Sequence, residues 1–400
     1  MNTLKPSCHK NYAACFLLLW MVLALVSLSP DILNGLCVDR SIGSDGEKRI
    51  LNYIKKEVEH LGIQTVRDRF SFYAPILDRS ELHFWEESLL CDAYPCTRDT
   101  GDLGVQGKLI YIPRISDAEE SDINQAIVLT ESDFTERCKN ILTQGNAAGV
   151  ITYKEGRSLQ NCYFSQEPCS DMLTAIEIRT ADAIRLLRSG VETVKIIMRP
   201  KEQYFPAENL YALLPGKDHS QAIVICAHYD SVPLAPGAID NLSGTLILLF
   251  LLEMLAVKTP KNDILFCWFG AEEWNCAGSR HFVNEARDFT KKTSCAINID
   301  SADCILGFDE LYYSCSDMRL LKQLLIPRTG LRTLNQIYGG DNRSFQAIGV
   351  DTLTFSRGGK LINTLMHTED DTLQNAGITA RSLRYAAHRI LNIIYPLIFG

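Results

Sequence analysis

The sequence predicts an α/β fold: a mixed, mostly parallel sheet with helices on both faces, together with a smaller inserted α/β domain. Three short and almost wholly apolar runs, at 221–227, 263–270 and 294–299, are typical of strands buried on both faces of a parallel sheet. Two segments of helical pattern, 243–257 and 278–286, lie between them. The order strand, helix, strand, helix, strand is what an α/β sheet requires. With 400 residues, 46% of them hydrophobic, the chain is long enough to contain two units.

Each of the three predicted strands leads into a side chain that can bind a metal. The first run ends at His228, the second leads into Glu272 and Glu273, and the third leads into Asp300. Ligands of open α/β sheets bind beyond the carboxyl ends of the strands, so we expect these side chains to meet there. The two adjacent glutamates point different ways at such a junction. One can therefore bind a metal while the other acts as a base toward a metal-held water.

Three further residues complete the inventory of a two-metal hydrolase site. Asp230 follows His228 by two residues and lies on the same side of an extended segment, where it can accept the ring N–H. Asp240 has two carboxylate oxygens and could bridge two cations, and His367 supplies a second imidazole far downstream. Any one of these residues alone is more often an ordinary surface or core side chain. The set in this order is what indicates a function.

Over about residues 205–400, these motifs resemble the M28 family of co-catalytic zinc aminopeptidases, whose fold is of the zinc exopeptidase type. The resemblance implies two zinc ions (Zn²⁺) per chain, with His228 and Asp300 on one ion, Glu273 and His367 on the other, and Asp240 bridging both. It also implies that Glu272 is the general base and that Asp230 is the partner of His228. The expected activity is that of a metallo-exopeptidase, a hydrolase that removes amino-terminal residues from peptides with a free amino terminus.

The downstream motifs agree with the family in one place and depart from it in another. Residues 367–372 match the family pattern His-Thr-x-x-Asp-Thr. Many members carry Ser-Asp-His before a Phe, whereas this chain has Gly340, Asp341 and Asn342, which changes the expected substrate side without removing a metal ligand. For Asp303 and Asp371, a role in a loop or cap is as reasonable as a catalytic one.

Two other functions remain open at this point. A glutaminyl cyclase-like transferase with a single zinc shares many of the same residues, so the number of bound metals separates it from the peptidase better than the ligands do. A non-catalytic, receptor-like member of the fold is the third possibility, although no expected ligand is missing here.

The chain begins with the pattern of a signal peptide over residues 1–29. A lysine-containing segment precedes an apolar run at 13–26, which suits a signal-peptide core and is short for a membrane span of about 20 residues. We therefore expect a secreted or otherwise exported protein. The alternative is an uncleaved membrane anchor, the one case in which a membrane contact is expected.

Three further parts follow the leader. Residues 30–73 are expected to form the amino-terminal part of the catalytic domain, with a helix at 44–62 that ends at a C-capping glycine. Residues 74–204 are expected to be an inserted domain and 205–400 the catalytic domain. Short apolar runs at 107–113, 149–153 and 174–178, with a helical pattern at 182–187, resemble a protease-associated domain.

The net charge bears on nucleic-acid binding, and the cysteines bear on disulfide formation. The net charge of -8 argues against nucleic-acid binding, because there is no basic stripe to neutralise phosphates. In an exported protein, the best disulfide candidates among the 14 cysteines are Cys91 with Cys96 and Cys162 with Cys169. Cys226 and Cys267 lie inside apolar runs and are expected to be buried thiols.

Overall fold

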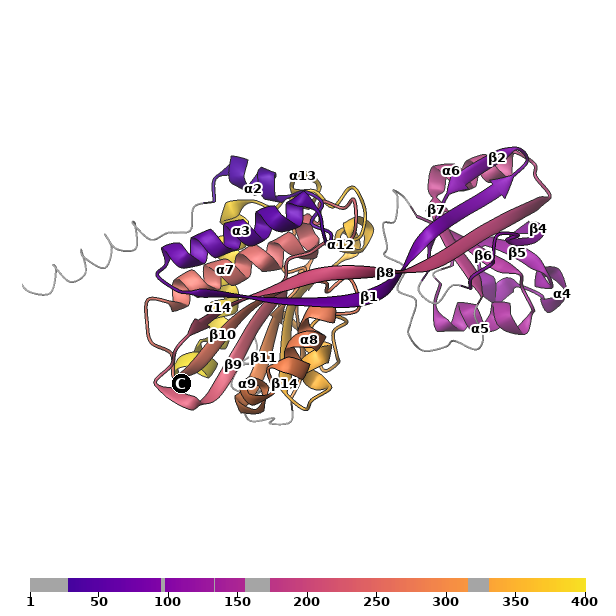
Figure 1. Ribbon diagram of the computed structural model, residues 1–400. Helices are drawn as coiled ribbons and strands as arrows, with labels where there is room; N and C mark the ends of the chain where they lie inside the picture. The colour runs from indigo at the N-terminus through magenta and orange to yellow at the C-terminus, as the bar shows by residue number, and fades with distance from the viewer. Residues whose placement is uncertain (1–27, 95–97, 133, 155–172, 316–330) are drawn as a thin grey trace, which may run out of the picture.

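The computed structural model describes residues 28–94, 98–132, 134–154, 173–315 and 331–400. These residues form two bodies that are joined by a pair of long antiparallel strands, β1 (Thr65–Phe84) and β8 (Thr193–Leu214) (Figure 1). Residues 1–27 of the predicted signal peptide lie outside the described part of the chain, as do Cys96, Cys162 and Cys169 of the two proposed disulfides.

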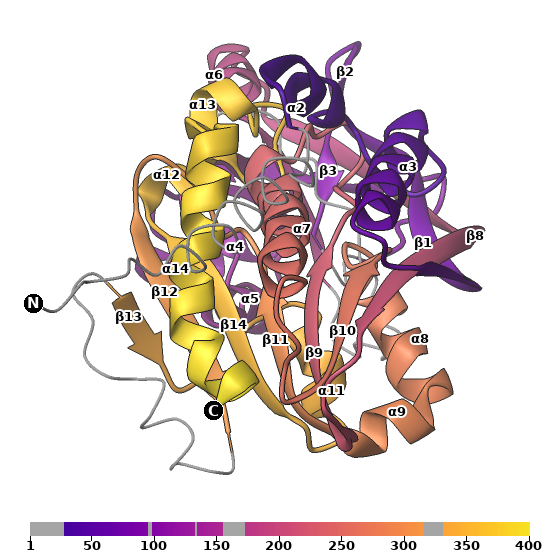
Figure 2. The ribbon, with the colours of Figure 1, turned by 90° about the vertical axis from the view of Figure 1, so that its left-hand side faces the viewer.

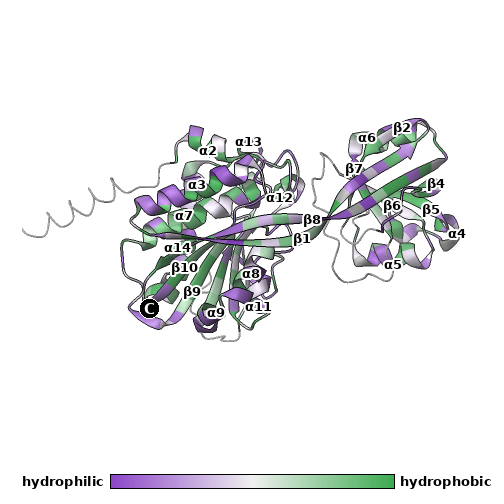
Figure 3. Ribbon diagram, in the orientation of Figure 1, coloured by the Kyte–Doolittle hydropathy of each residue, from purple (hydrophilic) through white to green (hydrophobic). Residues whose placement is uncertain are grey.

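The larger body contains a mixed sheet with a parallel centre. Besides β8, its strands are β9 (Asp218–His228), β10 (Asn262–Phe269), β11 (Thr293–Ile299), β12 (Phe308–Ser314), β13 (Leu331–Leu334) and β14 (Asp351–Gly358). Strands β10, β9, β11 and β14 pair in parallel in that order, while β8 and β12 join the two sides of this group antiparallel. The three predicted strands are thus confirmed as β9, β10 and β11. All eight residues of β10 are buried, which explains its unbroken apolar run, and the central strands are largely hydrophobic (Figure 3).

Helices cover both faces of this sheet, as the sequence predicts (Figure 2). One face carries α2 (Pro30–Leu36), α3 (Asp45–His60), α7 (Gly244–Leu255) and α14 (Ala380–Phe399). The other face carries α8 (Ala277–Glu285), α9 (Arg287–Lys292) and α11 (Asn342–Gln346). Alternate residues of β9 serve the two cores: Ile223 and Ile225 belong to the first, and Val224 and Cys226 to the second. Cys226 and Cys267 are fully buried thiols, as expected.

Helix α7 is apolar all round because it lies between the sheet and the helices α3 and α14. Together with the π-helical turn η2 (Ala238–Ser243) it forms a stretch, Ala238–Leu255, that is apolar and long enough to cross a membrane. Since 94% of this stretch is buried inside the body, it is the core helix of the fold. Helix α3 confirms the predicted amino-terminal helix, and its N-cap Ser44 accepts a hydrogen bond from the Glu47 N–H.

The smaller body is a second α/β unit at the far end of the β1–β8 ribbon. Its strands are β2 (Glu87–Leu90), β3 (Asp92–Ala93), β4 (Val105–Tyr111), β5 (Ala126–Thr130), β6 (Gly149–Lys154) and β7 (Thr174–Arg179). Its helices are η1 (Ile115–Asp117), α4 (Glu120–Ile123), α5 (Glu136–Gln144) and α6 (Thr180–Arg188). Strands β4 to β7 pair in parallel, and β8 joins this sheet to that of the larger body. The predicted domain limits at 73/74 and 204/205 fall inside β1 and β8, and this division stays a prediction.

Two short helices complete the larger body beside its loops, α12 (Lys360–Leu365) and α13 (Leu373–Ala376). The segment between them carries His367 and Asp371, and α13 contacts η2, which carries Asp240. The carboxyl ends of β9, β10 and β11 therefore meet η2 and the α12–α13 segment at one edge of the sheet.

Candidate metal centre

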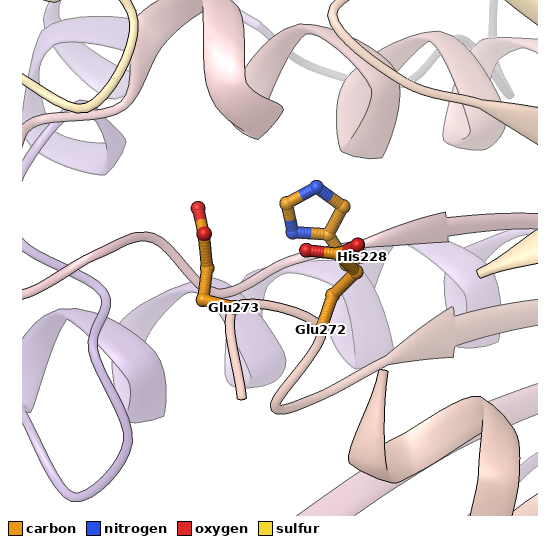
Figure 4. A group of neighbouring side chains, drawn as sticks. All are labelled: His228, Glu272 and Glu273. Atoms are coloured by element: carbon orange, nitrogen blue, oxygen red, sulfur yellow. The ribbon is translucent and has the colours of Figure 1, made fainter. Parts of the chain in front are cut away.

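The predicted ligands gather where the central strands end. His228 is the last residue of β9, Glu272 and Glu273 lie in the loop after β10, and Asp300 directly follows β11. Figure 4 shows the side chain of His228, at the end of β9, and those of Glu272 and Glu273, in the loop after β10, projecting into the same space. His228, Glu273 and Asp300 are buried, with 1%, 3% and 5% of their surfaces exposed. Such burial of metal-binding groups is costly unless the groups are paired or bind metals.

The ligand-type side chains form two sets that share one residue. Ligand atoms of His228, Asp240 and Asp300 lie within 4.8 Å of one another, and so do those of Asp240, Glu273 and His367. His228 Nε2 lies 3.2 Å from Asp240 Oδ1, whereas His367 Nε2 lies 3.0 Å from Asp240 Oδ2. The two oxygens of Asp240 thus face different imidazoles. These are the same two sets that the resemblance implies for two zinc ions.

The donor set fits zinc. Imidazole nitrogens and carboxylate oxygens are both common zinc ligands. The second carboxylate oxygen of Glu273, Oε1, is buried and has no hydrogen-bond partner among the described residues, which leaves it available to a metal or substrate. A third set of ligand-type atoms, from His228, Glu272 and Glu273, also lies within 4.8 Å, so Glu272 stands directly beside the centre.

The candidate centre contains more carboxylates than imidazoles, so negative charge is in excess there. Burial lowers the pKa of the His228 imidazole, but the carboxylates of Glu272 and Asp230 outweigh it and hold the pKa well above its usual value. Burial raises the pKa of Glu272 well above its usual value, and the neighbouring charge of Glu273 raises it further. For Asp240, burial alone would raise the pKa, but the hydrogen bonds to His228 and His367 prevail and lower it. Bound cations would relieve this excess of negative charge.

Asp230 does more than the sequence suggested. Its Oδ1 lies 3.5 Å from His228 Nδ1, within ion-pair distance but without a hydrogen bond to that nitrogen, so its role as the partner of the ring stays a prediction. Its closer contacts are with backbone: Oδ1 accepts a hydrogen bond from the Glu272 N–H at 3.1 Å and Oδ2 accepts one from the Glu273 N–H at 3.3 Å. A single buried carboxylate therefore aligns the end of β9 with the loop that carries both glutamates. Spacing alone could not predict this, because it depends on where that loop lies.

A thiol stands beside the proposed base. The Cys276 Sγ–H donates to Glu272 Oε1 at 3.4 Å, and burial raises the pKa of the thiol well above its usual value, so it stays protonated. Ala271, Asn275 and Cys276 have φ values of 58°, 58° and 55°, a left-handed conformation that is uncommon outside glycine. The Glu272–Glu273 loop is thus a tight, irregular turn. No spacing in the sequence singled out Cys276.

The segment that departs from the family pattern lies against the centre. A Cβ added to Gly340 would lie 2.6 Å from Asp300 Oδ2 and 3.5 Å from Glu272 Oε1, so this glycine gives the two carboxylates room. Asp341 is fully buried, and burial raises its pKa to about 7. Neither of its carboxylate oxygens has a hydrogen-bond partner in the described part of the chain. Asp341, the residue after this glycine, therefore adds a further buried carboxyl group beside the proposed metal ligands.

Asp371 serves the loop that carries Asp240. Its Oδ1 accepts a hydrogen bond from the Ile239 N–H at 2.8 Å, and its Oδ2 accepts one from the Asp240 N–H at 3.1 Å. Burial raises its pKa to about 7, although these two N–H groups act in the opposite direction. This geometry corresponds to the capping role considered from the sequence. Asp303 is buried too, but in the described part of the chain it forms no hydrogen bond or ion pair with the proposed metal ligands.

Comparison with known proteins relates the part of the chain that carries this site to a known family. Residues 209–394 match the profile of peptidase family M28. The chain is 25% identical over 287 residues to Aminopeptidase YwaD of Bacillus subtilis (strain 168), which covers 68% of this chain and 62% of that protein. It is 21% identical over 300 residues to the probable leucine aminopeptidase 2 of Aspergillus fumigatus, covering 70% and 58%. The matched region is thus less than two thirds of the length of these relatives.

Solved structures share the fold over almost the whole chain. BSAP, a zinc aminopeptidase from Bacillus subtilis, aligns with a TM-score of 0.71 at 22% identity, covering 92% of this chain and 94% of that one. The peptidase M28 precursor from Shewanella amazonensis SB2B aligns with a TM-score of 0.68 at 17% identity, covering 96% of both chains. The profile match and the shared fold agree: residues 209–394 of this chain match the domain of peptidase family M28.

Proposed function

We propose that this protein is a two-zinc aminopeptidase that hydrolyses the amino-terminal residue of peptides with a free amino terminus. The observation that carries the proposal is the position of Asp240, whose two oxygens face His228 and His367 at 3.2 and 3.0 Å. One shared carboxylate between two imidazoles is the arrangement that two adjacent cations need. The relatives that carry the name aminopeptidase support the choice of substrate.

The chain's own residues divide the work as follows. His228 and Asp300 would hold one zinc, Glu273 and His367 the other, and Asp240 both. When bound, the two ions would polarise the scissile carbonyl and lower the pKa of a water. Glu272 belongs to neither set of ligands, so it is free to take a proton from the attacking water and deliver it to the leaving amine. Asp230 keeps base and ligand at a fixed separation through the backbone N–H groups of Glu272 and Glu273.

The adjacent glutamates offer a matched pair of variants. Glu272→Gln removes the base but none of the proposed ligands, so it should retain zinc and lose activity by about 10²- to 10⁴-fold. Glu273→Gln removes a proposed ligand, so it should lose zinc, and its activity should fall because the metal is lost. Metal content would be measured on the purified proteins, beside the hydrolysis of a panel of aminoacyl amides with and without chelator. The same amides with an acylated amino group serve as the control for the requirement of a free amino terminus.

Each alternative function has its own outcome in this experiment. Two zinc ions per chain with chelator-sensitive release of amino-terminal residues support the peptidase. One zinc per chain with cyclisation of amino-terminal glutamine would establish the glutaminyl cyclase-like transferase instead. A protein that binds no zinc and hydrolyses none of the amides would be the receptor-like member of the fold.

A further inference from the structure

The loop that links His228 to the turn carrying Asp240 has no regular secondary structure of its own. Residues 229–237 run from His228 at the end of β9 to the turn η2, which carries Asp240. Within this loop there is no helix or strand, so its backbone polar groups need partners from elsewhere. Its course decides how far apart His228 and Asp240 lie.

Arg40, on the amino-terminal side of α3, supplies those partners. Its guanidinium donates three hydrogen bonds to carbonyl oxygens of the loop: from Nε to Tyr229 at 2.8 Å, from Nη1 to Pro236 at 2.6 Å and from Nη2 to Gly237 at 2.9 Å. A fourth bond, from Nη1 to the Val38 carbonyl at 3.2 Å, fixes the arginine to its own segment. The two ends of the loop are therefore held to a single planar group.

The same arginine is an unusual buried cation. Its side chain is completely buried, at 0% exposure. Among the described residues, no carboxylate oxygen lies within ion-pair distance of its guanidinium. Charged residues are almost never fully buried unless they are paired. For this arginine, the hydrogen bonds to carbonyl oxygens take the place of an ion pair and offset the cost of burial. Burial lowers the pKa of this guanidinium, while the negative charges of Asp371, Asp230 and Asp240 act in the opposite direction.

Two neighbours of Arg40 strengthen the link between its segment and the loop. The Arg40 N–H donates to Ser231 Oγ at 3.1 Å, and the Ser231 hydroxyl donates onward to the Ala235 carbonyl at 3.0 Å. The Leu234 N–H donates to Asp39 Oδ2 at 2.9 Å. The start, the middle and the end of the loop thus all contact residues 39 and 40.

Gly237 makes the close approach of the guanidinium possible. Its φ of 55° is in the left-handed region, and a Cβ at this position would lie 2.9 Å from Arg40 Nη2 and 2.8 Å from Ser231 Cβ. The same Cβ would also clash with the Asp240 carbonyl oxygen. Only glycine fits between the arginine and the start of the turn that carries the bridging carboxylate.

We propose that Arg40 is a positioning residue of the metal centre: by binding the carbonyls of Tyr229, Pro236 and Gly237 it fixes the separation of His228 and Asp240, and so sets the affinity for zinc. The proposal rests on the proposed two-zinc function. It assigns part of the centre to a residue outside the M28 match at 209–394, some 189 residues before Tyr229 in the chain.

The test compares Arg40→Met with a matched control in the full-length protein. Arg384→Met removes an arginine of α14 that is only half-buried and that contacts Glu253 of α7 at 3.0 Å. Zinc affinity is measured on metal-free protein by competition with a chromophoric chelator, and thermal unfolding is followed with and without zinc. We expect Arg40→Met to bind zinc about 10- to 100-fold more weakly, because substitution of residues that orient metal ligands lowers metal affinity by about this factor. The rise in Tm on adding zinc should shrink accordingly.

The control separates positioning from general support of the fold. Arg384→Met should lower the Tm equally with and without zinc, and its zinc affinity should stay within about twofold of the wild type, since distant sites act independently. An Arg40→Met protein with wild-type zinc affinity would overturn the proposal. Because affinity is measured directly, a protein that binds zinc but cleaves no peptide would refute the proposed activity and leave this test intact.

Two milder variants keep the test decisive if Arg40→Met does not fold. Arg40→Lys retains the charge but presents one nitrogen in place of a planar fork, so it should also lose zinc affinity. Wild-type affinity in Arg40→Lys would show that the three carbonyl contacts do not matter. Ser231→Ala removes one link of the same network and should weaken zinc binding about fivefold, the effect of a single hydrogen bond of about 1 kcal/mol. No change in Ser231→Ala would count against the proposal as well.

Discussion

Asp371 provides a direct test of how Asp240, the proposed bridging carboxylate, is held in place. Its two oxygens each accept a backbone N–H, one from Ile239 at 2.8 Å and one from Asp240 at 3.1 Å. Asp371→Asn keeps the size of the side chain but leaves one acceptor oxygen, so one N–H would face an amide NH₂ group. A buried donor left without an acceptor costs about 1–3 kcal/mol. We expect Asp371→Asn to lower the free energy of unfolding of the metal-free protein by that amount.

The same substitution should weaken the metal centre. A shift of the backbone at residues 239 and 240 moves the carboxylate that both imidazoles contact, so zinc affinity should fall by about 10- to 100-fold. Stability would be measured by guanidinium unfolding of metal-free protein, and zinc affinity by competition with a chelator. Asp371→Ala, which leaves both N–H groups without an acceptor, should cost about twice as much stability as Asp371→Asn.

The neighbouring aspartate supplies the control. Asp370 is exposed, and Asp370→Asn makes the same chemical change one residue earlier in the chain. It should leave both unfolding and zinc affinity near the wild type, because surface substitutions seldom change stability by more than about 0.5 kcal/mol. If Asp370→Asn and Asp371→Asn behave alike in both measurements, the two N–H contacts do not hold the bridging residue.

Three further predictions concern the dependence of stability on pH, the export of the protein and its glycosylation. Burial raises the pKa of Glu47 to about 7, so the stability it contributes is present below its unfolded pKa near 4.5 and is lost as the pH rises through 7. Relative to the wild type, Glu47→Gln should therefore gain about 2–3 kcal/mol of unfolding free energy between pH 5 and pH 8, and a difference that does not vary with pH would refute this. We also propose that the protein is exported, with a mature amino terminus between residues 28 and 34, and amino-terminal sequencing that finds Met1 in membranes would establish an anchor. Asn241 begins an Asn-x-Ser sequon but is fully buried, so it should carry no glycan, which mass spectrometry of the exported protein can check.

The parts of the fold that the sequence predicted share one physical property. Strands β9, β10 and β11 are buried on both faces, so their apolar runs stand out and their ends are sharply marked by polar residues. His228, Glu272 and Asp300 could be placed together because parallel strands end at a common edge of the sheet. His367 follows no such strand, and only the resemblance to a family connected it with the others.

The residues that the sequence did not reveal act through folded loops. Arg40 binds carbonyls that lie 189, 196 and 197 residues away, and any residue type can offer a carbonyl, so no pattern marks the contact. Asp230 and Asp371 bind backbone N–H groups in the same way. Hydrogen bonds from side chains to the backbone are common in proteins, yet the backbone group that a given side chain binds depends on the tertiary fold. The grouping of the proposed ligands at one edge of the sheet was therefore easier to predict than the residues that hold their loops in place.

The ribbon that leads to the smaller body also supports the loop of the two glutamates. Phe72 of β1 and Phe205 of β8 have ring centroids 5.4 Å apart, and Phe205 lies 4.7 Å from the ring of Trp274, the residue after Glu273. Trp274 is only 8% exposed because these rings cover it. Aromatic contacts at such distances stabilise beyond the area that they bury. The strands that connect the two bodies thus help to support the loop that carries Glu272 and Glu273, so a change of the ribbon near Phe72 and Phe205 would reach this loop through the ring of Trp274.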